Sequence, residues 1–191
     1  MKRVKLAVFI SGRGSNMLSI LEAAQNPDFP AEISVVLSNT STATGIESAK
    51  KHGIATEIVE HQHFDSREDF EDEIQERLEK HDIDFIVLAG FMRILSENFV
   101  TQWHDRILNI HPSLLPEYKG LNTHERAITD GKTETGCTVH FVTSDLDSGP
   151  IILQKKVPIL KDDTPESLAQ RVLEQEHIAY PEAIKLIASS V

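Results

Sequence analysis

The sequence has a single cysteine, Cys137, among its 191 residues. A disulfide within the chain is therefore excluded, and a lone thiol suits a reducing compartment such as the cytoplasm. No basic residue adjoins Cys137, so its thiol lacks the cationic sequence neighbour that activates a nucleophilic cysteine. We interpret Cys137 as a small buried hydrophobic residue.

Positive charge is also scarce, because 19 Lys and Arg residues face 30 Asp and Glu residues and the net charge is −11. Nucleic acids and anionic membranes attract proteins through cationic surfaces, so we expect neither as a partner. No apolar run reaches the roughly 18 residues that cross a bilayer, and no secretory signal pattern opens the chain. We expect a cytoplasmic protein.

Paired metal ligands are missing as well. His61 and His63 share a loop, but no H-x-x-x-H, H-E-x-x-H or cysteine pair accompanies them, so we expect no metal site. His140 falls in an apolar stretch, and we interpret it as a packing residue.

The composition is otherwise typical of a globular protein, with 40% hydrophobic and 26% charged residues. The sequence shows no repeat, low-complexity tract or linker. The length suits one domain, so we expect residues 1–191 to form a single domain.

Short apolar runs alternate with helical patterns over the first 110 residues, which predicts an α/β fold. We expect an open, mostly parallel twisted sheet with helices on both faces. Beyond residue 120 we expect a helix, an antiparallel C-terminal strand pair and a last helix that breaks before Pro181. The expected strands are 3–10, 33–37, 54–59, 83–89, 107–110, 135–142 and 150–157. The expected helices are one with apolar positions from 17 to 24 that ends near residues 26–27, then 44–52, 67–80, 96–103, 122–130 and one from 164 onward.

The first motif, S-G-R-G-S-N at residues 11–16, lies between a strand and a helix. Free backbone N–H groups and the helix dipole attract phosphate at such a position. The motif is not a dinucleotide fingerprint, because Met17 stands where G-x-G-x-x-G requires its last glycine. The alternative is a simple turn in which Asn16 caps the helix.

The second motif, N-I-H-P-S-L-L-P at residues 109–116, follows a predicted strand. Asn109 and His111 alternate, so both side chains point to the same side of that strand, and sites in open α/β sheets form beyond the carboxyl ends of strands. A histidine can transfer a proton, and a neighbouring amide can stabilise an oxyanion. The alternative is a histidine that hydrogen-bonds to a loop backbone.

The third motif is D-L-D-S-G at residues 145–149. A carboxylate from this turn would orient the His111 ring if the fold brought the two together. The alternative is an Asx-turn without a further role.

Seven segments in this order and spacing resemble the phosphoribosylglycinamide formyltransferase family, and the resemblance covers nearly the whole chain. They are ISGRGSNM at 10–17, FDSRE at 64–68, VLAGFMRIL at 87–95, NIHPSLLP at 109–116, GLNTHERAI at 120–128, VHFVTSDLDSGPII at 139–152 and QEH at 175–177.

The resemblance implies a Rossmann-like formyltransferase fold and a role in one-carbon metabolism. The implied reaction transfers the formyl group of 10-formyltetrahydrofolate, a co-substrate, to the amine of 5-phosphoribosylglycinamide in de novo purine biosynthesis. It implies no metal, and it leaves a monomer and a homodimer open.

The resemblance also assigns roles to residues. Asn109, His111 and Asp147 match the catalytic residues of the family. Those that match the binding sites are Gly14, Ser15, Asn16 and Glu176 for the ribonucleotide, and Arg67, Met92, Arg93, Ile94, Leu95, Asn109, Thr143, Ser144, Asp145, Leu146 and Asp147 for the folate. The Leu115–Pro116 bond matches a cis-proline of the family.

Two positions depart from the common pattern of the family, Arg13 in the first motif and Asn122, where a histidine is frequent. Formyltetrahydrofolate hydrolase and methionyl-tRNA formyltransferase resemble this chain plus an extra domain, for which we expect no room. A non-catalytic module that binds a phosphorylated metabolite is the alternative from another class, but it has no need of Asn109, His111 and Asp147 together.

Overall fold

A seven-stranded sheet in the order β3-β2-β1-β4-β5-β6-β7 forms the centre of the computed structural model, which describes residues 3–190. The first five strands run parallel, β6 runs antiparallel to β5, and β7 runs antiparallel to β6. This arrangement confirms the predicted mostly parallel sheet with an antiparallel C-terminal pair. The strands are β1 (Val4–Ile10), β2 (Ala31–Ser38), β3 (Ala55–Ile58), β4 (Phe85–Leu88), β5 (Ile107–His111), β6 (Glu134–Phe141) and β7 (Ile151–Pro158).

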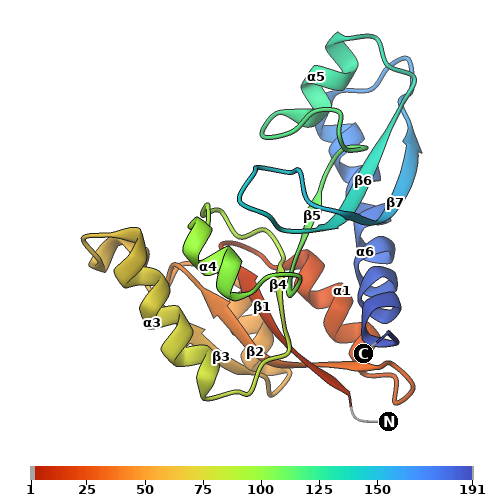
Figure 1. Cartoon of the computed structure of the whole chain (residues 1–191). Helices are drawn as coiled ribbons and strands as arrows, with labels where there is room; N and C mark the ends of the chain where they lie inside the picture. The colour runs from red at the N-terminus through yellow and green to blue at the C-terminus, as the bar shows by residue number, and fades with distance from the viewer. Residues whose placement is uncertain (1–2, 191) are drawn as a thin grey trace.

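Helices cover both faces of the sheet, as predicted (Figure 1). One apolar cluster joins the sheet to α1, α2 and α6, and the other joins its opposite face to α3 and α4. The helices are α1 (Ser15–Ala24), α2 (Gly45–Lys51), α3 (Arg67–Glu79), α4 (Glu97–Gln102), α5 (Thr123–Thr129) and α6 (Pro165–Ala188), with a short 3-10 helix at His61–His63. In the part of the chain that the structure covers, none of these helices has the length and apolar character to cross a membrane.

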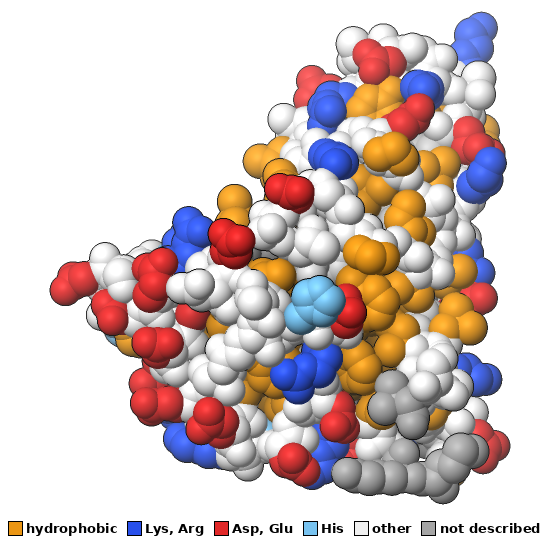
Figure 2. All heavy atoms as spheres, viewed as in Figure 1, with side chains coloured by type: hydrophobic (Ala, Val, Ile, Leu, Met, Phe, Trp, Pro, Cys, Tyr) orange, Lys and Arg blue, Asp and Glu red, His pale blue; other side chains and the backbone are white. Residues whose placement is uncertain are grey.

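Strand β1 shows how the sequence encodes the two layers. Val8 and Ile10 belong to the cluster under α1 and α6, whereas Ala7 and Phe9 belong to the cluster under α3 and α4. A strand buried on both faces needs apolar residues at every position, which explains its continuous apolar run. Helix α3 packs only one stripe on the sheet, and Figure 2 shows acidic side chains gathered over its outer side.

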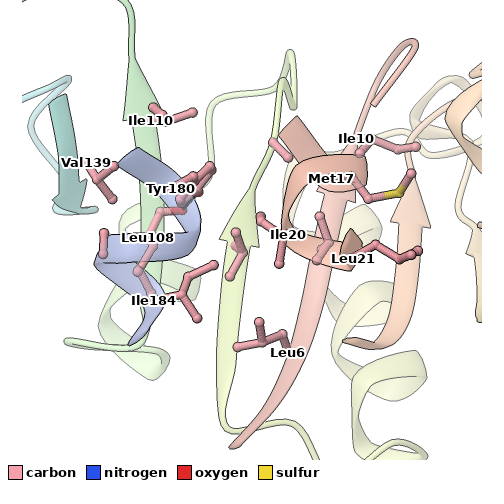
Figure 3. Close-up of a cluster of buried hydrophobic side chains, with 14 of the residues drawn as sticks. Leu6, Ile10, Met17, Ile20, Leu21, Leu108, Ile110, Val139, Tyr180 and Ile184 are labelled. Atoms are coloured by element: carbon pink, nitrogen blue, oxygen red, sulfur yellow. Dashed lines mark hydrogen bonds between the residues drawn. The ribbon is translucent and has the colours of Figure 1, made fainter. Parts of the chain in front are cut away.

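Helix α6 corrects the predicted break before Pro181, because it runs without interruption through that proline. A proline inside a helix removes one backbone hydrogen bond. Apolar burial on both sides of Pro181 offsets this loss, since Tyr180 and Ile184 lie in the core. Figure 3 shows both side chains projecting from the helix toward the side of the sheet that carries Leu108 and Ile110.

Tyr180 also anchors α6 through a polar contact inside the core. Its hydroxyl donates to the Leu88 carbonyl oxygen at 2.8 Å and lies 3.1 Å from the Leu108 carbonyl oxygen. The two carbonyls belong to the neighbouring strands β4 and β5. One side chain therefore ties the last helix to the centre of the sheet, where water cannot replace the contact.

We predict that Tyr180→Phe lowers the thermal midpoint by about 2–4 °C, the equivalent of about 1 kcal/mol for a chain of this size. The only other tyrosine, Tyr118, is the matched control, because its exposed hydroxyl bonds Asp130 and Tyr118→Phe should leave the midpoint unchanged. Calorimetry of both variants checks the prediction. Equal midpoints for Tyr180→Phe and the unaltered chain would refute the anchoring role.

Candidate functional site

The carboxyl ends of the parallel strands bring two of the predicted segments together. Ser11, after β1, accepts a hydrogen bond from the Met92 backbone N–H on its hydroxyl at 2.8 Å. The Ser11 backbone N–H donates to the Gly90 carbonyl oxygen at 3.1 Å. The glycine loop and the segment after β4 therefore lie side by side at the edge where open α/β sheets bind ligands.

His111 and Asp147 meet in the structure. His111 Nδ1 lies 3.4 Å from Asp147 Oδ2, and both side chains are buried. The turn that carries Asp147 leaves the β6–β7 pair and extends toward the side of the molecule where α4 lies (Figure 1). Asp145, on the same turn, stays exposed, so the structure separates the two aspartates of the third motif.

The other nitrogen of the His111 ring faces a backbone acceptor, because Nε2 lies 2.8 Å from the Tyr118 carbonyl oxygen. A carbonyl oxygen only accepts, so Nε2 is the donor in this contact. The Asp147 carboxylate is itself held by the Gly120 backbone N–H at 2.9 Å. Tyr118 and Gly120 both have positive φ, which folds residues 117–120 back over His111.

A second set of contacts holds the loop that follows His111. The Leu115 backbone N–H donates to Thr138 Oγ1 at 3.0 Å, and that hydroxyl donates to the Ser113 carbonyl oxygen at 2.6 Å. Gln154 on β7 donates to the Leu115 carbonyl oxygen at 2.9 Å. The Leu115–Pro116 bond is cis, in agreement with the resemblance. The antiparallel strands thus position the loop from outside the site.

His140 is a polar member of the site that the sequence interpretation assigned to packing. It is 2% exposed, but its Nε2 lies 3.4 Å from Asn109 Nδ2 and 3.9 Å from Asp147 Oδ1. Burial lowers the pKa of His140, so the ring is neutral at pH 7. The missing signal was the strand register, which pairs His140 directly with Asn109.

The glycine loop reaches α1 through Gly14, whose φ is +70°. A Cβ at Gly14 would lie 3.2 Å from Met17 Cε, so both the backbone conformation and the space favour glycine. Backbone N–H groups in the first turn of α1, at Ser15 and Asn16, have no partner within the helix. They supply the donors that the first motif predicted for a phosphate.

Asn16 does not cap α1, so that alternative is wrong. The cap position is Gly14, and Asn16 Nδ2 instead donates to Glu176 Oε2 on α6 at 2.8 Å. Asn16 Oδ1 is buried without a partner among the described residues. Burial raises the pKa of the Glu176 carboxyl, and the bond from Asn16 opposes that shift. The pair places a carboxylate beside the glycine loop, 160 residues away in sequence.

The residues that the resemblance assigned to the folate mostly lie at the surface. Arg67 is the first residue of α3, Leu95 is a buried member of the second apolar cluster, and the rest of residues 92–95 are exposed. Leu146 is an exposed apolar residue of the turn between β6 and β7. Leu121, 79% exposed after β5, is a further apolar residue at this edge that sequence reasoning did not single out. Exposed apolar side chains from separate loops suit a flat ring system.

The histidines that raised the question of a metal have other partners. His61 Nδ1 lies 3.0 Å from the Asn39 carbonyl oxygen, and His63 lies 3.3 Å from Glu60. Within residues 3–190, no group of three or more His, Cys, Asp or Glu side chains is arranged to hold a metal ion. Cys137 is buried, as predicted, and burial raises the pKa of its thiol to about 12.

We predict that Glu176→Gln stabilises the free protein, and more so at higher pH. Because burial raises the pKa of Glu176, folding opposes its ionisation, and this cost grows as pH rises through the folded-state pKa. The midpoint of the Gln variant should therefore exceed that of the unaltered chain by a few degrees at about pH 8 and match it near pH 4. Thermal scans check this, with Glu174→Gln at an exposed α6 position as the control. A difference that shrinks with rising pH would contradict the assignment.

Three comparisons with known proteins place this geometry in a family. Residues 4–184 match the formyl transferase family. Phosphoribosylglycinamide formyltransferase from Escherichia coli is 45% identical over 185 residues, which are 97% of this chain and 87% of that protein. The solved structure of phosphoribosylglycinamide formyltransferase from Brucella melitensis is 48% identical in sequence and has a TM-score of 0.95. The match covers 100% of this chain and 98% of that one.

The chain also resembles part of a larger protein. The human trifunctional purine biosynthetic protein adenosine-3 is 46% identical over 188 residues, and the match covers 98% of this chain but 19% of that protein. The chain therefore spans about a fifth of the length of this relative. The match to the Escherichia coli enzyme, by contrast, covers most of both proteins. The chain belongs to the formyl transferase family, as a phosphoribosylglycinamide formyltransferase-type member.

Proposed function

We propose that the protein transfers the formyl group of 10-formyltetrahydrofolate to the amine of 5-phosphoribosylglycinamide. This transfer is one step of the de novo purine pathway, whose product is IMP. The observation that carries this proposal is the meeting of His111 and Asp147, with Asn109 two residues from His111 on the same strand. The names of the similar proteins from Escherichia coli and Brucella melitensis support the same reaction. The lone buried cysteine is consistent with a cytoplasmic location.

The spacing of the sheet suits a phosphorylated substrate with a short amide arm. Strands β1, β4 and β5 are neighbours, so the ends of β1 and β5 lie about 10 Å apart. In this proposal the N–H groups of Gly14, Ser15 and Asn16 hold the phosphate, and Glu176 accepts hydrogen bonds from the ribose hydroxyls. The glycinamide arm then extends across β4 to Asn109.

The folate occupies the other side of the site in this proposal. Apolar side chains of Met92, Ile94 and Leu146 contact its rings, and Leu95 supports them from the core. Polar contacts come from the remaining folate-binding residues, which are Arg67, Arg93, Asn109, Thr143, Ser144, Asp145 and Asp147. Both substrates bound side by side remove most of the entropy cost of their encounter.

The reaction forms one C–N bond and breaks another. The substrate amine attacks the formyl carbon, and negative charge develops on the formyl oxygen, which Asn109 and His111 stabilise by donation. The attacking nitrogen loses a proton, and the folate nitrogen gains one as it departs. His111 carries out proton transfer, and Asp147 orients its ring. His111 Nε2 must exchange the Tyr118 carbonyl for the substrate, so residues 117–120 shift when the substrates bind.

A spectrophotometric assay tests the proposal directly. The protein is mixed with 10-formyltetrahydrofolate, or its dideaza analogue, with and without the ribonucleotide. Release of the deformylated folate only when the ribonucleotide is present supports the transferase. Equal release in both mixtures identifies a hydrolase, and no release in either, with ribonucleotide binding seen by calorimetry, identifies a non-catalytic binding module.

We predict that His111→Ala lowers kcat by about 10²–10³ while the protein stays folded, because a proton-transfer group and oxyanion donor is lost. Circular dichroism checks the fold, and the same assay measures kcat. His104→Ala at an exposed position is the control and should keep normal turnover. Near-normal kcat for His111→Ala would remove His111 from the mechanism.

A further inference from the structure

Asn109 and His140 face one another across the antiparallel β5–β6 pair. They are direct partners in the strand register, so their side chains project to the same side of the sheet. Asn109 Nδ2 lies 3.4 Å from His140 Nε2, and within residues 3–190 the Asn109 side chain makes no other hydrogen bond. This contact therefore decides how the Asn109 amide is oriented.

The surroundings of His140 define which of its nitrogens carries the proton. Nδ1 lies 2.8 Å from the Phe141 carbonyl oxygen, which only accepts, so Nδ1 is the protonated nitrogen. Two further ionisable groups face the ring. The first is Asp147, whose Oδ1 lies 3.9 Å from Nε2, too far for a hydrogen bond. The second is His111, which lies on the other side of the Asp147 carboxylate. In a neutral ring with this tautomer, Nε2 presents a lone pair and accepts from Asn109.

A primary amide has two orientations that differ by exchange of its oxygen and its nitrogen. With nitrogen toward His140, Asn109 uses one N–H there and keeps the second N–H for another acceptor. With oxygen toward His140, two lone pairs would face each other, and that orientation is disfavoured. An oxyanion requires a hydrogen-bond donor. In the first orientation the second N–H of the same nitrogen is that donor, and its direction is fixed by the bond to His140.

We propose that His140 is a positioning residue that holds the Asn109 amide with an N–H, rather than the carbonyl oxygen, available to the reacting oxygen. This inference rests on the proposed formyl transfer. His140 does not touch the substrate in this account, and it acts only through Asn109. Because the N–H serves the charge that develops on the formyl oxygen, the effect of His140 is mainly on kcat rather than on KM.

A double-mutant cycle tests the coupling. His140→Leu should lower kcat about tenfold, the range of one lost hydrogen bond, and should change KM much less than kcat. In the Asn109→Ala background the same change should cost less than about twofold, because no amide remains to be oriented. His140→Gln keeps an oxygen acceptor and should recover most of the loss. His81→Leu, at a partly buried histidine paired with Glu57, is the control.

Equal losses from His140→Leu in both backgrounds would overturn the proposal, and so would a loss confined to KM. A nitrogen-15 NMR spectrum of the unaltered protein adds a test that needs neither activity nor a folded variant. It should show a protonated Nδ1 and an unprotonated Nε2 for His140, and the opposite tautomer would overturn the proposal. If the unaltered protein shows the expected tautomer but transfers no formyl group, the proposed function fails while the Asn109–His140 contact stands.

Discussion

The antiparallel register between β5 and β6 places most of the site. It sets Asn109 opposite His140 and His111 opposite Thr138, and it starts the turn that brings Asp147 to His111. A slip of one residue would turn each of these side chains to the other face of the sheet. Leu108 and Ile110 alternate with these residues and are buried in the core. A slip would take them out of this core, so their burial fixes the register.

The parallel half of the sheet supplies the second part of the site, and α6 joins the two. Tyr180 bonds to carbonyls of β4 and β5, while Glu176, one turn earlier, reaches Asn16 beside the glycine loop. A buried carboxyl with a raised pKa weakens the free fold, and it gives the proposed ribose site an acceptor shielded from water. Stability and binding thus oppose each other at this residue.

Much of the fold follows from local patterns, because the strands and helices have strong apolar periodicity and the motifs stand at strand ends. The predicted break before Pro181 is wrong, because Tyr180 and Ile184 are buried against partners distant in sequence, and this burial offsets the cost of the proline. The interpretation of His140 as a packing residue is incomplete for a similar reason. An apolar stretch predicts burial, but only the register shows that the buried ring faces Asn109. The Asn16–Glu176 bond likewise joins the two ends of the chain.

The most direct measurement is a crystal structure of the protein with 5-phosphoribosylglycinamide and a folate analogue that cannot transfer its formyl group. We predict the phosphate at the N–H groups of Gly14, Ser15 and Asn16, and the substrate amine beside Asn109. His111 Nε2 should have left the Tyr118 carbonyl to face the reacting group. A ribonucleotide bound elsewhere, or a His111 ring still bonded to Tyr118 with both ligands in place, would contradict the account.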